Sequence, residues 1–215
     1  MAKVHSFTFN PFQENTYIVY DDTRNCIIFD PGNINVKEDK IISSFIESEQ
    51  LNVVQLINTH CHLDHVFGNS FVFEKYKVPF GMHRGELPVL NSFLPTCQLY
   101  GIPIKVASPN PTSYIEHQDV IEFGNTRLVA LLTPGHSPAS LSFYCENDGF
   151  ILSGDVLFRD SIGRTDLPGG NFDTLINSIQ THLFSLPDDT IVYSGHGPTT
   201  TIGYEKKNNP FLNEL

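Results

Sequence analysis

The stretch that decides the fold reads Val53-Val54-Gln55-Leu56-Ile57-Asn58-Thr59-His60-Cys61-His62-Leu63-Asp64-His65. Its first half is an apolar run typical of a buried strand, and its second half places three histidines and one aspartate within six residues. Side chains alternate along an extended backbone, so His60 and His62 leave on the same face and can bind one ion together, whereas Cys61 points to the other face. The stretch therefore predicts a metal site at the end of a strand.

The pair Asp64 and His65 lies where a helix is expected to begin, over residues 64–76. Once the chain turns into a helix, this pair no longer shares the direction of His60 and His62. It is then free to bind a second ion a few ångströms away. Two metals are therefore expected from this stretch alone.

Length and composition favour a single enzyme domain over residues 1–215. A chain of 215 residues buries about 70% of its unfolded surface in one core. Its formal net charge of −11, with only 13 lysines and arginines, argues against nucleic-acid binding. The chain shows no signal-peptide core and no apolar run of about 18 residues, so we expect a cytoplasmic protein without a membrane partner. The composition leaves the oligomeric state open. The four cysteines include no CxxC pair, so reduced thiols are expected at Cys26, Cys61, Cys97 and Cys145.

Strands and helices are expected in two successive runs of similar order. The expected strands cover 4–9, 16–20, 26–30, 53–57, 78–82, 119–123, 126–132, 140–145, 150–153 and 190–193. The expected helices cover 64–76, 84–93 and 173–184, the last capped by Asn171 or Asp173, with one more around 41–46. Residues 94–115 are rich in proline and small polar residues, which predicts an irregular connection that could shape a substrate pocket. The residues after 193 read as a polar end.

Three further candidate ligands stand at the ends of expected strands, and each follows a glycine. They are His136, Asp155 and His196. Glycine lets the backbone turn sharply beside a crowded centre, so repeated Gly-His and Gly-Asp pairs at sheet edges fit loops that converge on one site.

The chemistry of these donors points to a reactive metal centre. Imidazole nitrogens and carboxylate oxygens suit Zn²⁺, with Fe or Mn²⁺ as alternatives, and the absence of thiolate pairs argues against a closed structural zinc site. Two divalent metal ions about 3.5–4 Å apart can hold a hydroxide and polarise an acyl oxygen. Asp64 is then the catalytic residue, which orients the hydroxide. Ser137 and Ser153 adjoin ligands but do not lie in a GxSxG motif, so no serine nucleophile is expected.

The order of these ligands resembles a known family. His60-x-His62-x-Asp64-His65, followed by His136, Asp155 and His196, resembles the metallo-β-lactamase superfamily over nearly the whole chain. The resemblance implies an α/β fold, a four-layer αβ/βα sandwich of two mixed β-sheets flanked by helices. Three strings resemble the compact glyoxalase II-like hydrolases: Ser161-Ile162-Gly163-Arg164-Thr165-Asp166-Leu167-Pro168-Gly169-Gly170, Gly195-His196-Gly197-Pro198-Thr199-Thr200, and Asn209-Pro210-Phe211-Leu212.

The resemblance also implies roles for single residues. One metal is bound by His60, His62 and His136, the other by Asp64, His65 and His196, and Asp155 bridges them. Asp30 and Asp166 are expected to support the site from behind the ligands.

The implied reaction is hydrolysis of a thioester, with S-2-hydroxyacylglutathione (S-lactoylglutathione) or a similar small thiol ester as the substrate. Arg164 matches a basic residue with which larger glyoxalase II enzymes bind glutathione, whereas Pro198 stands where those enzymes have a tyrosine. The end of the chain at Leu215 leaves no room for their added helical domain, so Lys206 is the remaining candidate cation and weak glutathione binding is expected. Two alternatives stay open at this point: a mononuclear-iron persulfide dioxygenase, and a metal-binding module without turnover.

Overall fold

The structure is a computed structural model that describes residues 1–212. The chain forms two compact units, each of which contains one six-stranded sheet. The first unit holds residues 1–115 together with 122–126, and the second holds residues 116–121 and the chain from 127 onward. The single domain expected over residues 1–215 stays a prediction.

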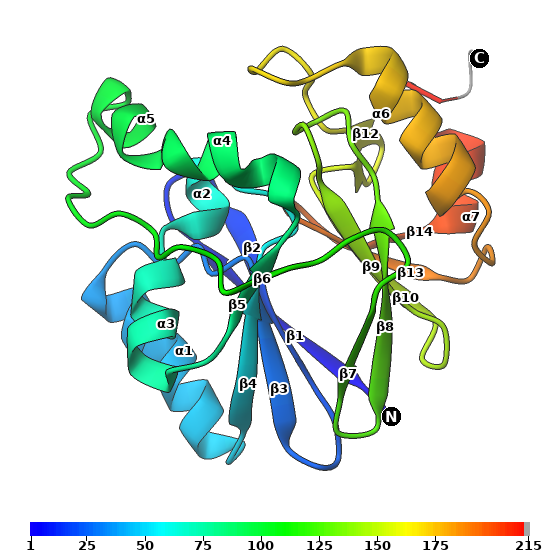
Figure 1. Cartoon of the computed structure of the whole chain (residues 1–215). Coiled ribbons are helices and arrows are strands. Elements are labelled where there is room, and N and C mark those ends of the chain that lie inside the picture. The colour runs from blue at the N-terminus through cyan, green and yellow to red at the C-terminus, as the bar shows by residue number, and fades with distance from the viewer. Residues whose placement is uncertain (213–215) are drawn as a thin grey trace. The chain divides into compact units, whose positions relative to one another are not determined.

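The sheet of the first unit is mixed and runs in the order β1-β2-β3-β4-β5-β6. The strands β1 (Lys3–Phe9), β2 (Glu14–Tyr20) and β3 (Asn25–Phe29) pair antiparallel. The strands β4 (Asn52–Ile57), β5 (Phe80–Met82) and β6 (Ser113–Tyr114) continue the sheet in parallel. Residues 58–65, which carry the first four candidate ligands, are called the ligand loop below. Figure 1 shows the chain leaving the end of β4 and entering the short helix α2 (Leu63–Val66), which holds the last part of this loop.

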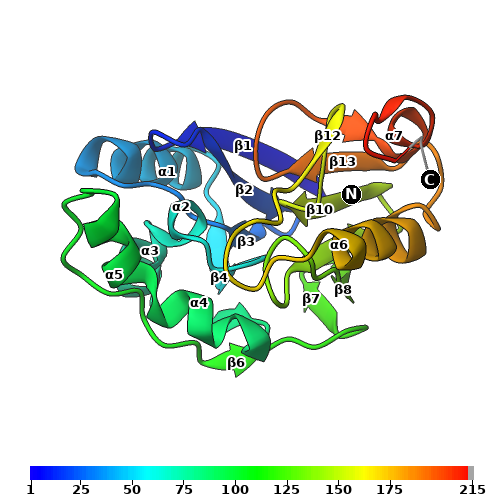
Figure 2. The same cartoon turned by 90° about the horizontal axis from the view of Figure 1, so that it is seen from above.

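Two helices cover one face of this sheet, as Figures 1 and 2 show from two directions. They are α1 (Val36–Ser48) and α3 (Asn69–Tyr76). Their buried residues Ile42, Ile46 and Val72 belong to the same core cluster as Ile28 and Leu56 of the sheet. Burial of these side chains holds the helices against the strands that end at the ligand loop.

The helix expected over 64–76 is interrupted, and the interruption has a specific cause. Between α2 and α3, the Gly68 amide donates to Pro31 O at 2.7 Å, and Asp64 O instead accepts a hydrogen bond from Asn10 Nδ2 at 3.1 Å. These are the two backbone groups that a continuous helix would join. A Cβ on Gly68 would lie 1.9 Å from Asn33 Oδ1, so glycine is needed for this close approach.

The region expected to be irregular from residue 94 is partly helical. A 3₁₀ turn, η1 (Arg84–Glu86), leads into α4 (Leu87–Asn91), and α5 (Phe93–Leu99) follows directly. Pro88 and Pro95 lie in the first turns of their helices, where the missing N–H costs no hydrogen bond. The expectation of an irregular chain was therefore wrong for residues 94–99, because prolines were read as breakers rather than as helix starters. Residues 102–111 form no helix or strand.

The sheet of the second unit is also mixed and runs in the order β14-β13-β10-β9-β8-β7. Its strands are β7 (Val120–Phe123), β8 (Thr126–Leu132), β9 (Leu141–Cys145), β10 (Phe150–Gly154), β13 (Ile191–Ser194) and β14 (Thr200–Thr201). The pairing of β10 with β13 is parallel, whereas β8 with β9, β9 with β10 and β13 with β14 are antiparallel. Two mixed sheets with flanking helices were expected, and this is confirmed.

Two helices pack on this second sheet. The helix α6 (Phe172–Ser178) begins after Asn171, whose Oδ1 accepts from the Thr174 amide at 2.8 Å, and continues as a π-helical turn, η2 (Ile179–Leu183). The helix α7 (Ile202–Asn208) lies in a segment that was expected to be only a polar end. Its buried residue Ile202 joins Leu175 and Val192 in one core cluster. A two-stranded hairpin, β11 (Leu157–Phe158) and β12 (Ser161–Ile162), completes the unit.

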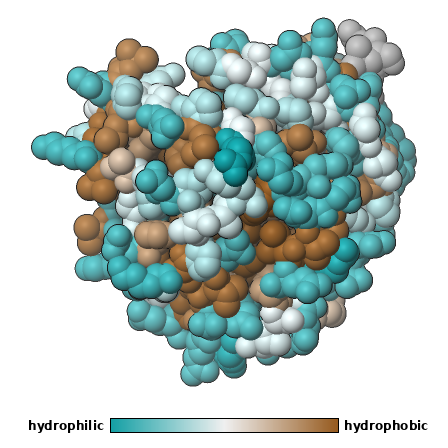
Figure 3. Space-filling model, in the orientation of Figure 1, coloured by the Kyte–Doolittle hydropathy of each residue, from teal (hydrophilic) through white to brown (hydrophobic). Residues whose placement is uncertain are grey.

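Hydrophobic side chains reach the surface at several places. Figure 3 shows brown side chains over α5, where Leu99 is 82% and Tyr100 54% exposed. Phe12 lies 6.4 Å from Tyr100 between ring centroids and is itself partly exposed. No helix among residues 1–212 combines the length and apolar character needed to span a membrane.

Candidate metal centre

The ligand loop of the first unit brings its three histidines together. His60 and His62 lie in the extended segment after β4, and their ring centroids are 4.8 Å apart. The ring of His65, on α2, lies 4.1 Å from that of His60. His60 and His65 are fully buried, whereas His62 is partly exposed. The two imidazoles that were expected to share a direction therefore lie close together.

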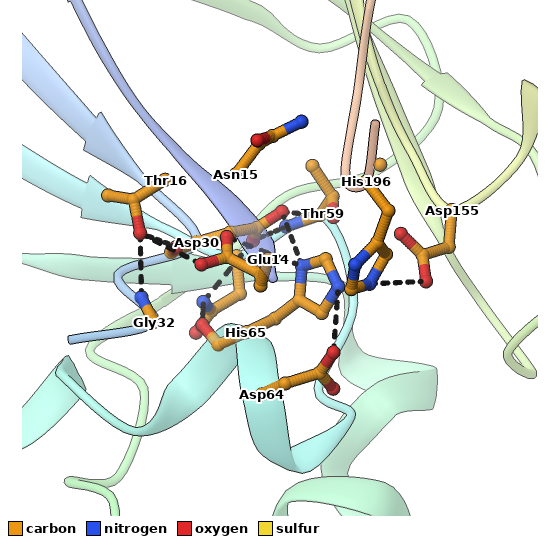
Figure 4. Close-up of polar contacts among 12 residues, drawn as sticks. Glu14, Asn15, Thr16, Asp30, Gly32, Thr59, Asp64, His65, Asp155 and His196 are labelled. Atoms are coloured by element: carbon orange, nitrogen blue, oxygen red, sulfur yellow. Dashed lines mark hydrogen bonds and ion pairs between the residues drawn. The ribbon is translucent and has the colours of Figure 1, made fainter. Parts of the chain in front are cut away.

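Asp30 holds this loop through contacts with Thr59 and His65, which Figure 4 draws as dashed lines. It follows β3 with a left-handed backbone, φ 47°, and one carboxylate oxygen accepts the Thr59 amide at 2.7 Å while the other accepts the Thr59 hydroxyl at 2.6 Å. The second oxygen also lies 3.1 Å from His65 Nδ1. A carboxylate beside Nδ1 keeps the proton on that nitrogen and leaves Nε2 to bind a metal.

A buried carboxyl that the sequence did not indicate lies beside the same histidine. Glu14, at the start of β2, is fully buried; its Oε2 accepts the Thr16 hydroxyl at 2.9 Å, and its Oε1 lies 4.0 Å from His65 Nδ1. Burial raises the pKa of Glu14 well above its usual value; His65 opposes this, while Asp30 and Asp64 add to it. A glutamate between Gln13 and Asn15 reads as a loop residue in the sequence, so nothing local marked it as part of the site.

In the second unit, two candidate histidine ligands face one carboxylate oxygen of the third candidate ligand, Asp155. His136 follows β8, Asp155 follows β10 and His196 follows β13. Asp155 Oδ2 lies 3.4 Å from Nε2 of His136 and 3.4 Å from Nε2 of His196. In Figure 4 the side chains of Asp155 and His196 point toward each other. The strand ends thus converge as expected, and one carboxylate oxygen faces two imidazole nitrogens.

Backbone groups set the orientation of His136. Its Nδ1 lies 2.7 Å from Arg164 O, so the ring donates through Nδ1 and presents Nε2 toward Asp155. Gly135, just before it, has φ 127°, and a Cβ there would lie 2.3 Å from Leu175 N. This position requires glycine because of both its backbone angle and the close contact with α6.

The expected substrate-binding residues already have partners. Arg164 donates to Asp166 through Nε and Nη2, each at 2.7 Å, and both side chains are exposed. The hydrogen bond from Arg164 holds the pKa of Asp166 down to about 2. Lys206 Nζ, on α7, lies 2.7 Å from Asp188 Oδ1. The roles given to Arg164, Asp166 and Lys206 stay predictions.

Comparison with known proteins now bears on this donor set. A family model described as the metallo-beta-lactamase superfamily matches residues 9–196, which include all seven candidate ligands. The chain belongs to the metallo-β-lactamase superfamily. The donors fit a metal centre on chemical grounds as well, since one carboxylate oxygen of Asp155 lies 3.4 Å from an imidazole nitrogen of His136 and of His196.

Several members of the metallo-β-lactamase superfamily are similar to the chain over almost their whole length. The probable metallo-hydrolase YqgX of Bacillus subtilis is 39% identical, and the match covers 94% of each chain. The hydroxyacylglutathione hydrolase GloC of Haemophilus influenzae is 36% identical, again over 94% of each chain. The crystal structure of TTHA1623 in a di-iron-bound form is 34% identical, with a TM-score of 0.88 over 97% of this chain and 100% of that one.

A solved structure whose name carries a different activity is similar to the chain to the same degree. The crystal structure of the B3 metallo-β-lactamase BLEG-1 is 37% identical, with a TM-score of 0.87 over 99% of both chains. These matches establish the metallo-β-lactamase fold and a hydrolase family, in which the substrates of the relatives differ.

Proposed function

We propose that this protein is a metal-dependent hydrolase of thioesters, with S-2-hydroxyacylglutathione esters such as S-lactoylglutathione as substrates. The observation that carries the proposal is Asp155 Oδ2, which lies 3.4 Å from an imidazole nitrogen of His136 and of His196, so that one carboxylate oxygen faces two imidazole donors. The similarity to GloC supports the choice of substrate. The string of residues 161–170, which contains Arg164 and resembles the glyoxalase II-like hydrolases, is the local part of the sequence that supports the same choice.

The proposed centre takes two divalent metals, with Zn²⁺ as the first expectation. In this proposal His60, His62 and His136 would hold one metal, Asp64, His65 and His196 would hold the other, and Asp155 would be a ligand of both. When bound, such a pair supplies a water that ionises near neutral pH and a Lewis acid for the acyl oxygen. The similarity to a protein solved in a di-iron-bound form makes iron the competing choice.

The side chains of the chain itself have separate tasks in this scheme. Asp64, whose Oδ2 lies 3.9 Å from His65 Nε2, orients the attacking water and accepts its proton. Asp30 holds His65 and Thr59 in place, so the ligand loop need not reorganise during the reaction. Arg164 exchanges Asp166 for a carboxylate or carbonyl of the substrate, with paired hydrogen bonds.

The decisive experiment follows thiol release and oxygen uptake together. Purified protein of measured metal content is given S-lactoylglutathione, and we expect free glutathione to appear without consumption of oxygen. Rapid oxygen uptake with glutathione persulfide would instead establish the dioxygenase, and no turnover of either would leave the metal-binding module. A chromogenic cephalosporin belongs in the same series because of the similarity to BLEG-1, and we expect negligible cleavage.

A further inference from the structure

The backbone of the ligand loop is held by two buried carboxylates, one on each side of His60. The Thr59 amide donates to Asp30 Oδ1 at 2.7 Å, and the Cys61 amide donates to Glu86 Oε2 at 2.9 Å. Because the loop has left the sheet after β4, these amides have no neighbouring strand to pair with. Side-chain carboxylates therefore accept the backbone amides of this loop, as carbonyl groups of a neighbouring strand would in a sheet.

Glu86 is unusual for a glutamate in its burial. It is the last residue of η1, it is fully buried, and its own amide donates to His83 O at 3.1 Å. A carboxylate is retained in such a place only where strong donors compensate the loss of water, and a backbone N–H is such a donor. The sequence separation of 25 residues between Glu86 and Cys61 makes the contact a tertiary one.

The side chain of Cys61 does not explain the presence of Glu86. Its thiol is buried and lies 3.4 Å from Met82 Sδ, on the core side of the loop. Burial raises the pKa of this thiol well above its usual value, and the charges of Glu86 and Asp30 raise it further. The contact that Glu86 makes with this residue is with its backbone amide.

We infer that Glu86 is a positioning residue of the metal centre: by holding the Cys61 amide it fixes the direction in which His60 and His62 leave the loop, so that the two imidazoles address one metal. The inference rests on the proposed metal centre. The ring positions of His60 and His62 depend on the orientation of the two peptide planes on either side of Cys61. The histidines cannot fix these planes themselves, so this task falls to Glu86, a residue of η1.

Two substitutions distinguish the effect of the length of the Glu86 side chain from the effect of its charge. Glu86→Asp keeps the charge but withdraws the carboxylate by about 1.5 Å, the length of one C–C bond, so it cannot reach the Cys61 amide. Glu86→Gln loses the charge but keeps an oxygen at the same place to accept that amide. Both side chains are polar and no larger than glutamate, so the core is not overfilled.

The matched control is Asp21, a second buried carboxylate of the first unit that accepts backbone amides. Asp21 directly follows β2, whereas Glu14 is the first residue of that strand, so the two lie at opposite ends of it. Asp21 accepts the Thr23 amide at 2.9 Å and the Asn125 amide at 2.6 Å. Asp21→Ala should lower the unfolding temperature without touching the ligand loop.

Affinity for Zn²⁺ is measured on metal-free protein by competition with a chromophoric chelator, and the visible spectrum of the Co²⁺ form reports ligand geometry. We expect Glu86→Asp to weaken Zn²⁺ binding by about 10- to 100-fold and to alter the Co²⁺ spectrum, and Glu86→Gln to retain most of the affinity. Asp21→Ala should change neither readout. Unchanged affinity and spectrum in Glu86→Asp would overturn the inference, as would a greater loss in Glu86→Gln than in Glu86→Asp.

Zn²⁺ affinity and thioester hydrolysis test the role of Glu86 and the proposed substrate separately. A wild-type protein that binds Zn²⁺ tightly but does not hydrolyse thioesters would refute the substrate, while the order of the Glu86 variants would still stand. A wild-type protein that hydrolyses S-lactoylglutathione, with Glu86→Asp as tight a Zn²⁺ binder as wild type, would refute only the positioning role.

Discussion

Single side chains divide into the candidate metal ligands and the groups that hold these ligands in place. His62 is partly exposed, whereas His60 and His65 are fully buried and backed by Asp30, Thr59 and Glu14. Buried polar groups of this kind are costly unless every partner is in place, so the removal of any one should propagate to the others. The ligands and the groups behind them are therefore best tested separately.

Loss of one ligand should remove metal and activity together. The wild type is predicted to contain two transition metals per chain. We expect the metal content of His62→Ala and of Asp155→Ala to be lower, because an incomplete set of donors cannot neutralise the site. Elemental analysis and thioester turnover measure the two losses. His117→Ala is the control, since this exposed histidine accepts the Leu132 amide and packs beside His182, away from the candidate ligands. One tightly bound iron, with activity that survives His196→Ala, would contradict a two-metal centre.

Arg164 should matter more than Lys206 for substrate binding. A guanidinium can bind a carboxylate or carbonyl with paired hydrogen bonds, so Arg164→Ala should lower kcat/KM by roughly ten- to hundred-fold, which corresponds to about 1.4–2.8 kcal/mol. Lys206→Ala should have little effect, because Lys206 already pairs with Asp188. Steady-state kinetics with S-lactoylglutathione distinguish the two. Tight, saturable binding that is lost in Lys206→Ala and kept in Arg164→Ala would show that the assignment is reversed.

Secondary-structure elements position the ligands through their ends rather than through their middles. The clearest case is the break between α2 and α3, where the Gly68 amide and the Asp64 carbonyl each bond to a different part of the chain. The break lets Asp64 and His65 sit on a short helix of their own, packed beside the loop that carries His60. The contact of Gly68 with Asn33 makes the break depend on the absence of a side chain.

Gly68→Ala should therefore destabilise the protein. The added Cβ would lie 1.9 Å from Asn33 Oδ1, and Asn33 is itself buried and donates to Asp39 at 2.6 Å. We expect a loss of about 1–3 kcal/mol in the free energy of unfolding, measured by urea titration. Because the clash involves one side chain, Asn33→Ala in the same protein should restore part of the loss. If the double variant loses the full sum of the two single effects, the clash is not the cause.

Across the whole molecule, stability should depend on the metals and on pH. A ligand that binds only the folded state stabilises it by about 2.7 kcal/mol at 100 times its dissociation constant. Removal of the metals by a chelator should thus lower the unfolding temperature, by about 5–11 °C at 2–4 °C per kcal/mol. Differential scanning fluorimetry with and without chelator measures the shift. A shift of equal size in His62→Ala would mean that the metals bind elsewhere.

The acid limit of stability should include a contribution from Asp21. Burial alone would raise the pKa of Asp21, but the hydrogen bonds from Thr23, Asn125 and Thr126 together lower it below its usual 3.8. A carboxyl with a lowered folded-state pKa stabilises the protein above its unfolded pKa, and this stability is lost as the pH falls through about 4 and below. Asp21→Asn should flatten the dependence between about pH 5 and 3 in metal-free protein, measured by urea titration at each pH. Parallel curves for variant and wild type would refute this.

The sequence by itself determined much of the fold and the ligand candidates. The alternation of side chains along an extended chain predicted that His60 and His62, just after β4, share a direction, and apolar runs predicted all but the shortest strands. Both are local properties, because they follow from the pleat of one strand and the burial of one face. The same holds for the strand ends that carry His136, Asp155 and His196, since turn residues after an apolar run mark them directly.

Only the tertiary structure decided what surrounds those ligands. Glu14 and Glu86 read as loop or surface residues, yet both are fully buried against the ligand loop. The break at Gly68 and the helix α7 likewise depend on partners far away in the chain, namely Pro31 O and the core around Val192. A buried carboxylate is stable only where a distant donor meets it, and no local pattern records that meeting.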